Sequence, residues 1–167
     1  IPSNEIHDNG LYGYGIRLYF TVRGEVTDNH VYNSSFYNTG TGIRISGSPG
    51  GEPIVSDNRI HDTDTAIDAS YTWVFDNTVW GNETGISLDN GAVAHDNEAF
   101  NNTIGMNISS AQAYDNEVYQ NSDCGIQSHF SLIQSNRVYS NPVGIDDSGY
   151  SRIYNNALWD LSLIHIS

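Results

Sequence analysis

The chain contains no lysine, a single cysteine and no long apolar segment. Its six basic residues are all arginine and are outnumbered by 20 acidic residues, which gives a net charge of −14. This balance argues against binding to nucleic acid or to anionic membranes, because both require a positive surface. Cys124 has no second cysteine with which to form an internal disulfide. No apolar run approaches the ~20 residues that span a bilayer, so membrane insertion is not expected either.

An asparagine recurs along the whole chain, followed two positions later by an apolar residue. The spacings between successive asparagines are 25, 29, 19, 20, 19, 20 and 20 residues. These asparagines are Asn4, Asn29, Asn58, Asn77, Asn97, Asn116, Asn136 and Asn156. A fixed period over the whole length predicts a stack of similar units, each of which buries its apolar face against its neighbours.

Each repeat contains three short segments in which apolar and polar residues alternate. Alternation with a period of two is typical of β-strands, whereas no helical period is visible. Gly, Asn, Asp and Ser fill the intervals, as turns require. We therefore predict an all-β parallel β-helix of about seven coils of ~20 residues, with three short strands in each coil. Each coil would pair in parallel with the last, ~4.8 Å away.

The recurring asparagines should lie at a bend, where each amide can bridge to the next coil. Such a hydrogen bond contributes about 0.5–1.5 kcal/mol net. A second asparagine column marks another bend and consists of Asn9, Asn82, Asn102, Asn121 and Asn141.

The segment from Asn77 to Ile86 resembles the N-x-I/V-x-x-N-x-x-G-I coils of the right-handed parallel β-helix family, which is found in carbohydrate-binding proteins and sugar hydrolases. The resemblance covers about residues 4–158. It implies a right-handed solenoid, a polysaccharide partner and an extracellular or cell-surface location. The family includes lyases, epimerases, hydrolases and non-catalytic modules, so the fold does not decide the activity.

Residues 1–160 form one predicted β-helix domain, which reads as a fragment of a longer solenoid. Residues 161–167 abandon the repeat and resemble a translated sequencing adaptor, so they are excluded from the fold prediction. Uncapped coils expose strand edges, which predicts end-to-end self-association.

The first candidate site lies on the two longest coils, where insertions are expected to form surface loops. Arg17 and Arg44 occupy the outward position after the Gly-Ile pairs of these coils, and Asp68 follows on the next coil. Arginine suits bidentate capture of carboxylates such as those of uronic-acid sugars, and Asp68 could then serve as an acid or base. Three tyrosines are added as substrate-binding candidates: Tyr12, Tyr14 and Tyr19. The alternative is an ordinary solvated strand face.

A column of rings follows the buried position after each main asparagine. Its members are His7, Tyr32, His61, Trp80, Phe100, Tyr119, Tyr139 and Trp159. Tyr32 and Trp80 are candidates for stacking on sugar rings, although a structural ladder of rings explains the column equally well. His61 is a weak acid–base candidate, because Asp62 follows it. His7 and Asp8 repeat the pair at the same position, which favours a scaffold role.

A column of carboxylates precedes the main asparagines. Asp57, Asp76, Asp96 and Asp115 could hold Ca²⁺ through oxygen ligands. Capping of the bends explains the same column without metal, and no other cofactor is expected.

Three functions remain open. The leading one is a carbohydrate-associated module that presents a rigid face to a polysaccharide, because no complete catalytic set is visible. The first alternative is a segment of a lyase, C5-epimerase or hydrolase that acts on uronic-acid polymers. Asp146 and Asp147 faintly resemble the paired aspartates of polygalacturonase-type hydrolases, but the companion motifs are missing and a turn explains them better. The second alternative is the structural spacer of a surface adhesin.

Overall fold

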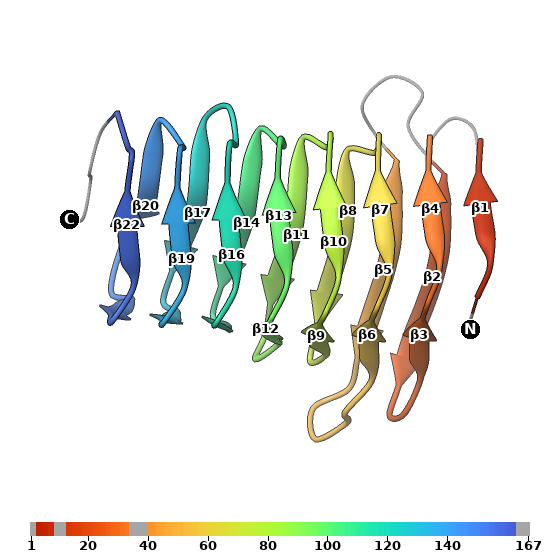
Figure 1. Cartoon of the computed structure of the whole chain (residues 1–167). Coiled ribbons are helices and arrows are strands. Elements are labelled where there is room, and N and C mark those ends of the chain that lie inside the picture. Colours follow the sequence, from red (N-terminus) through yellow and green to blue (C-terminus); the bar gives the residue numbers. More distant parts are fainter. Residues whose placement is uncertain (1–2, 9–12, 34–39, 163–167) are drawn as a thin grey trace.

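The computed structural model describes residues 3–8, 13–33 and 40–162. These residues form 22 strands in three parallel sheets, and the chain passes through the sheets in turn (Figure 1). The predicted all-β parallel solenoid with three strands per coil is thereby confirmed. The described residues include no helix, and therefore none that is long and apolar enough to cross a membrane.

The strands of each sheet come from successive coils. The first sheet contains β1 (Glu5–His7), β4 (His30–Tyr32), β7 (Arg59–His61), β10 (Thr78–Trp80), β13 (Glu98–Phe100), β16 (Glu117–Tyr119), β19 (Arg137–Tyr139) and β22 (Ala157–Trp159). The second contains β2 (Tyr14–Thr21), β5 (Thr41–Gly47), β8 (Thr65–Ser70), β11 (Thr84–Asp89), β14 (Ile104–Ser109), β17 (Cys124–His129) and β20 (Val143–Asp147). The third contains β3 (Glu25–Thr27), β6 (Ile54–Ser56), β9 (Trp73–Phe75), β12 (Val93–His95), β15 (Gln112–Tyr114), β18 (Leu132–Gln134) and β21 (Arg152–Tyr154).

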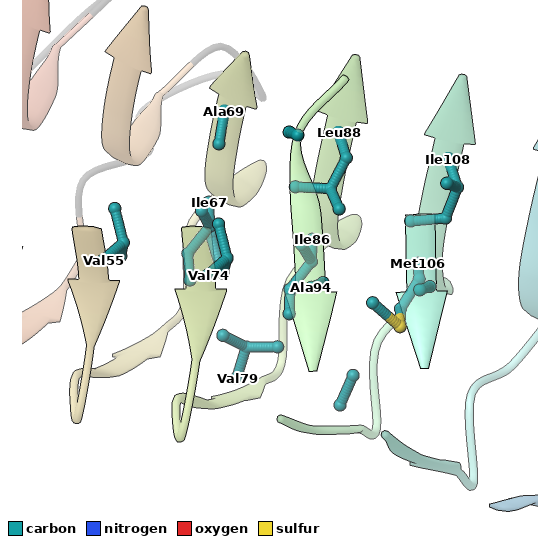
Figure 2. Packing of buried hydrophobic residues seen from close by; sticks show 14 of the residues in the cluster. Val55, Ile67, Ala69, Val74, Val79, Ile86, Leu88, Ala94, Met106 and Ile108 are labelled. Atoms are coloured by element: carbon teal, nitrogen blue, oxygen red, sulfur yellow. The ribbon is translucent and has the colours of Figure 1, made fainter. Parts of the chain in front are cut away.

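The core consists of files of like residues that run along the helix axis. One file on the second sheet is Ile16, Ile43, Ile67, Ile86, Met106, Ile126 and Ile145, and each member is the register partner of the next. All are at most 5% exposed. Figure 2 shows how aliphatic side chains of the second and third sheets meet in the interior. Each of these buried side chains stabilises the fold by roughly 1.5–3 kcal/mol.

Glycine precedes most members of this file, where neighbouring coils approach closely, and Ala66 takes the position before Ile67. A Cβ atom at Gly105 would lie 2.5 Å from Cγ1 of Val118 and 2.6 Å from the carbonyl oxygen of Gly125. A side chain at Gly105 would therefore need its neighbours to shift, because one of the two contacts is with backbone of the next coil.

Both asparagine columns form ladders. In the main column each Nδ2 donates to Oδ1 of the next asparagine at 2.9 to 3.0 Å, from Asn4 to Asn156. The second ladder starts at the hydroxyl of Thr63, which donates to Asn82 at 2.9 Å, and continues to Asn141. Asn9 lies outside the described residues. The predicted bridging role of the buried amides is confirmed.

The insertion at residues 46–53 contains the loop between β5 and β6, which projects beyond the other turns (Figure 1). At the far end of the solenoid, Leu161 lies against Gly144, since a Cβ atom at that glycine would meet Cδ1 of Leu161 at 2.6 Å. Residues 163–167 of the predicted tail lie outside the described residues.

Candidate functional site

The second sheet brings the principal site candidates into one outward file. Arg17 of β2 pairs in register with Arg44 of β5, and Arg44 pairs with Asp68 of β8. The neighbouring isoleucines point inward, so the alternation of the strand turns these three side chains outward. The file continues through the uncharged Ser87, Asn107 and Gln127 and ends at Asp146 of β20.

Arg44 links the middle of this cluster to its neighbours on both sides. Its Nε lies 3.2 Å from Oδ2 of Asp68, and its Nη1 donates to the hydroxyl of Tyr14 at 3.4 Å. The side chains of Arg44 and Asp68 are 38% and 30% exposed. The ion pair is thus partly screened by solvent and holds Arg44 in place more than it stabilises the fold.

Arg17 is held by aromatic rings. Its guanidinium carbon lies 4.3 Å from the ring centroid of Tyr14 and 4.1 Å from that of Tyr19. It forms no ion pair with a carboxylate of the described residues. Contact with rings occupies the faces of a planar guanidinium and leaves its N–H edges able to form hydrogen bonds. Arg17 is therefore a positioned cation with the donors needed to bind an external carboxylate.

Asp68 is the carboxylate of this file that lies directly beside Arg44, one coil beyond it and two coils beyond Arg17. Burial raises the pKa of Asp68, the positive charge of Arg44 opposes this rise, and Asp89 adds to it. The net shift is upward. A carboxyl with a raised pKa beside a guanidinium can exchange a proton with a bound molecule more readily than a free surface aspartate can. Tyr12, which was predicted to join this site, lies outside the described residues.

The ring column of the first sheet forms a continuous stack. Tyr32, His61 and Trp80 lie with centroids 5.3 and 4.4 Å apart and interplanar angles of 4° and 20°. The stack extends to His7 at one end and to Trp159 at the other. Because Tyr32 and Trp80 each have a ring on both faces, only their edges remain for an external sugar. This arrangement favours the structural ladder over sugar stacking.

His61 lies apart from Arg44 and Asp68, on the first sheet. Its Nδ1 is 2.8 Å from Asp62, and its Nε2 is 2.9 Å from Nε2 of His30. The pairs of His7 with Asp8 and of His95 with Asp96 have the same 2.8 Å contact. The repeated geometry identifies these pairs as part of the scaffold, in which each aspartate turns the chain in the left-handed region and fixes the preceding ring.

The third sheet carries a shorter ring stack that the sequence reasoning missed. Phe75, His95 and Tyr114 lie with successive centroids 5.1 Å apart and planes within 7° of parallel. Each follows the buried residue three positions before a main asparagine, so the same offset rule would have found it. The next member of this file is Gln134, which ends the stack.

The four calcium candidates occupy equivalent corners. Asp57, Asp76, Asp96 and Asp115 have φ values between 53° and 57°, in the left-handed region that aspartate tolerates. Among the described residues, no group of three or more His, Cys, Asp or Glu side chains is arranged to hold a metal ion. The corner geometry accounts for the aspartates, and calcium binding stays a prediction.

Comparison with known proteins identifies the architecture. A family model described as a right-handed β-helix region matches residues 1–158, which agrees with the predicted handedness. A solved structure described as the complex of XylC with xylose is 14% identical, with a TM-score of 0.44. The match covers 80% of this chain and 36% of that protein, so the chain spans about a third of its length. A search of curated proteins found no match.

Proposed function

Because the chain belongs to the right-handed β-helix family, we propose that it is a carbohydrate-associated module which binds an acidic polysaccharide along its second sheet. The observation that carries this proposal is Arg17, whose guanidinium contacts two tyrosine rings and pairs with no carboxylate of the described residues. Arg44 lies on the adjacent coil, about 4.8 Å further along the axis. Two cations at this spacing can hold carboxylates of a polyuronide chain that crosses the coils.

The charge of the whole molecule makes such a local site necessary. A net charge of −14 repels a polyanion at long range, so binding must depend on short-range contacts. Arg17 and Arg44 supply these contacts, and the tyrosines beside them offer apolar surface to the sugar rings. A polysaccharide partner implies an extracellular or cell-surface location, and we propose this location together with the function.

Calorimetric titration with oligomers of galacturonate and of alginate tests this function. We expect binding that weakens with salt and falls at least about tenfold in Arg17→Ala and in Arg44→Ala. Arg137→Ala is the matched control, because Arg137 is exposed on the first sheet. If no acidic polysaccharide binds, or if Arg137→Ala weakens binding as much as Arg17→Ala does, the proposal is wrong and a structural spacer is the better hypothesis.

A second candidate function is cleavage or epimerisation of the same polymer, with Asp68 as the acid–base group. The observation in its favour is the raised pKa of Asp68 beside Arg44. It predicts turnover of alginate or pectin that Arg44→Ala and Asp68→Asn abolish while the melting temperature is unchanged. Epimerisation is measured as proton exchange at C5 by NMR, and cleavage is measured as the release of shorter chains. Absence of both products from the wild-type protein would eliminate this candidate.

A further inference from the structure

The bend between the second and third sheets carries two exposed aromatic rings near the C-terminal end. Phe130 and Tyr150 stack with centroids 5.4 Å apart and planes 9° from parallel. They are 55% and 86% exposed, and their φ values are 49° and 62°. A bulky side chain is unfavourable in this left-handed region. The two preceding coils place Asn90 and Ser110 at this corner, where short polar side chains are tolerated better, and the coil before them places Tyr71 there.

The ring stack stops at Phe130, because the preceding coil has a serine in the corresponding place. Backbone hydrogen bonds from Ser110 to His129 and from Phe130 to Gly149 put these corners in successive register. A recess of about 330 Å³ runs past Phe130, lined by Gly91 and Ser110 on this side of the ring and by Tyr150 and Arg152 on the other. The space beside the Cα of Gly91 is open. One face of Phe130 therefore borders a gap where a further ring would fit.

Polar and apolar side chains both line this recess. Gln112, Leu132 and Arg152 are register partners at the start of β15, β18 and β21, and all three line the recess. An amide and a guanidinium thus lie on either side of an aliphatic side chain. Arg152 forms no ion pair within the part of the chain that the structure describes. A ring face with a few hydrogen-bonding groups around it is the usual composition of a small-molecule site.

We propose that this recess binds a neutral pyranose ring, whose apolar C–H face stacks on Phe130 in the position left open by Ser110. The coil spacing of ~4.8 Å matches the distance at which rings stack. Gln112 and Arg152 then donate hydrogen bonds to hydroxyl groups at the edge of the sugar. The volume of the recess lies at the lower end of the range of roughly 300–1,000 Å³ found for ligand sites, which suits a single sugar residue. This site is separate from the arginine file and does not depend on it.

Ligand-observed saturation-transfer NMR on the whole chain tests the proposal. The probes are methyl glycosides of glucose, galactose, mannose and xylose, together with their neutral tetrasaccharides. We expect at least one probe to bind. Its affinity should fall about tenfold or more in Phe130→Ala, which removes the stacking face, and in Ser110→Tyr, which fills the gap with a ring. Both corners are on the surface, so cooperative melting should be retained.

Two variants serve as controls. Trp73→Ala removes an exposed aromatic ring outside the recess, and Arg17→Ala removes the cation of the other site; neither should change binding of the neutral probes. Ser110→Tyr preserves the test if Phe130→Ala fails to fold. Absence of saturation transfer to every probe overturns the proposal, and so does wild-type affinity in Ser110→Tyr. Loss of polyuronide binding alone would contradict only the function proposed for the arginine file.

Discussion

The middle coils and the first two coils share an interior but differ on the outside. The inward file runs from Ile16 to Ile126 with isoleucine at every coil except that of Met106. The second-sheet strands have eight and seven residues in β2 and β5, against six in β8, β11, β14 and β17. Only β2 and β5 place arginine at the outward position that follows the isoleucine. Stacking neighbours constrain the interior at every coil, whereas the outward face can change at little cost in stability, so function is best sought where that face departs from the repeat.

The strongest test of this comparison introduces a charge into the shared file. Ile126→Asp buries an uncompensated carboxylate between Met106 and Ile145, which should cost more than about 4 kcal/mol and abolish cooperative folding. Ile16→Asp should cost less, because Ile16 lies in the first coil, which can fray without the rest. Urea denaturation followed by circular dichroism measures both. Gln127→Asp, one residue along and facing outward, is the control, and a wild-type midpoint for Ile126→Asp would contradict the stacked core.

The next largest effect is expected in the asparagine ladder. Oδ1 of Asn97 accepts hydrogen bonds from both the backbone N–H and the side chain of Asn77. Its Nδ2 contacts two backbone carbonyls and Asn116. Asn97→Ala leaves several of these buried groups unpaired and should cost on the order of 3 kcal/mol. Asn4→Ala, at the exposed end of the ladder, should cost about 1 kcal/mol. If Asn97→Ala and Asn4→Ala lower the free energy of unfolding by equal amounts, the contribution of each amide to stability does not depend on its burial.

The sequence predicts those parts of the molecule in which residues of the same type stack on one another in successive coils. A slip of one residue would turn an entire inward file to solvent, so the register of the isoleucines and of the main asparagines is fixed by the repeat itself. The same register also places Arg17, Arg44 and Asp68 in one file. These three candidates are brought together, whereas Tyr32, His61 and Trp80 lie on the first sheet. The binding role of the three residues remains a proposal.

The repeat does not predict contacts in which residues of different types stack in successive coils. Asp147 was expected to lie in a turn, yet it ends β20 as a buried residue and accepts a hydrogen bond from Ser128 at 2.8 Å. A second inward file of the second sheet runs through Leu88 and Ile108 to Ser128 and Asp147. Ser128 therefore already interrupts its aliphatic run one coil before Asp147. The recess beside Phe130 likewise depends on the absence of a ring at Ser110, which a column of similar residues does not reveal.

The C-terminal coils thus replace an aliphatic contact with a pH-sensitive one. Burial acts to raise the pKa of Asp147, but hydrogen bonds from Ser151 and Ser128 prevail and lower it below the ordinary value of 3.8. The ionised form therefore stabilises the folded state above the unfolded pKa, and this contribution is lost as the pH falls through the lower folded pKa. Urea midpoints measured from neutral pH to below pH ~4 should fall further for the wild type than for Asp147→Asn. Parallel curves for the two proteins would contradict the assignment.

The smallest expected effect concerns Cys124, which lies in register between Ile104 and Val143. Burial, followed by the nearby charge of Asp146, raises the pKa of the Cys124 thiol to about 12. The reactive thiolate is therefore scarce at neutral pH, and a thiol reagent should label the folded chain slowly and the urea-unfolded chain fast. Cys124→Val, which repeats the residue of the next coil, should change the free energy of unfolding by no more than about 0.5 kcal/mol. Rapid labelling of the folded wild type would contradict this burial and would mean that the coil carrying Cys124 opens in the folded chain.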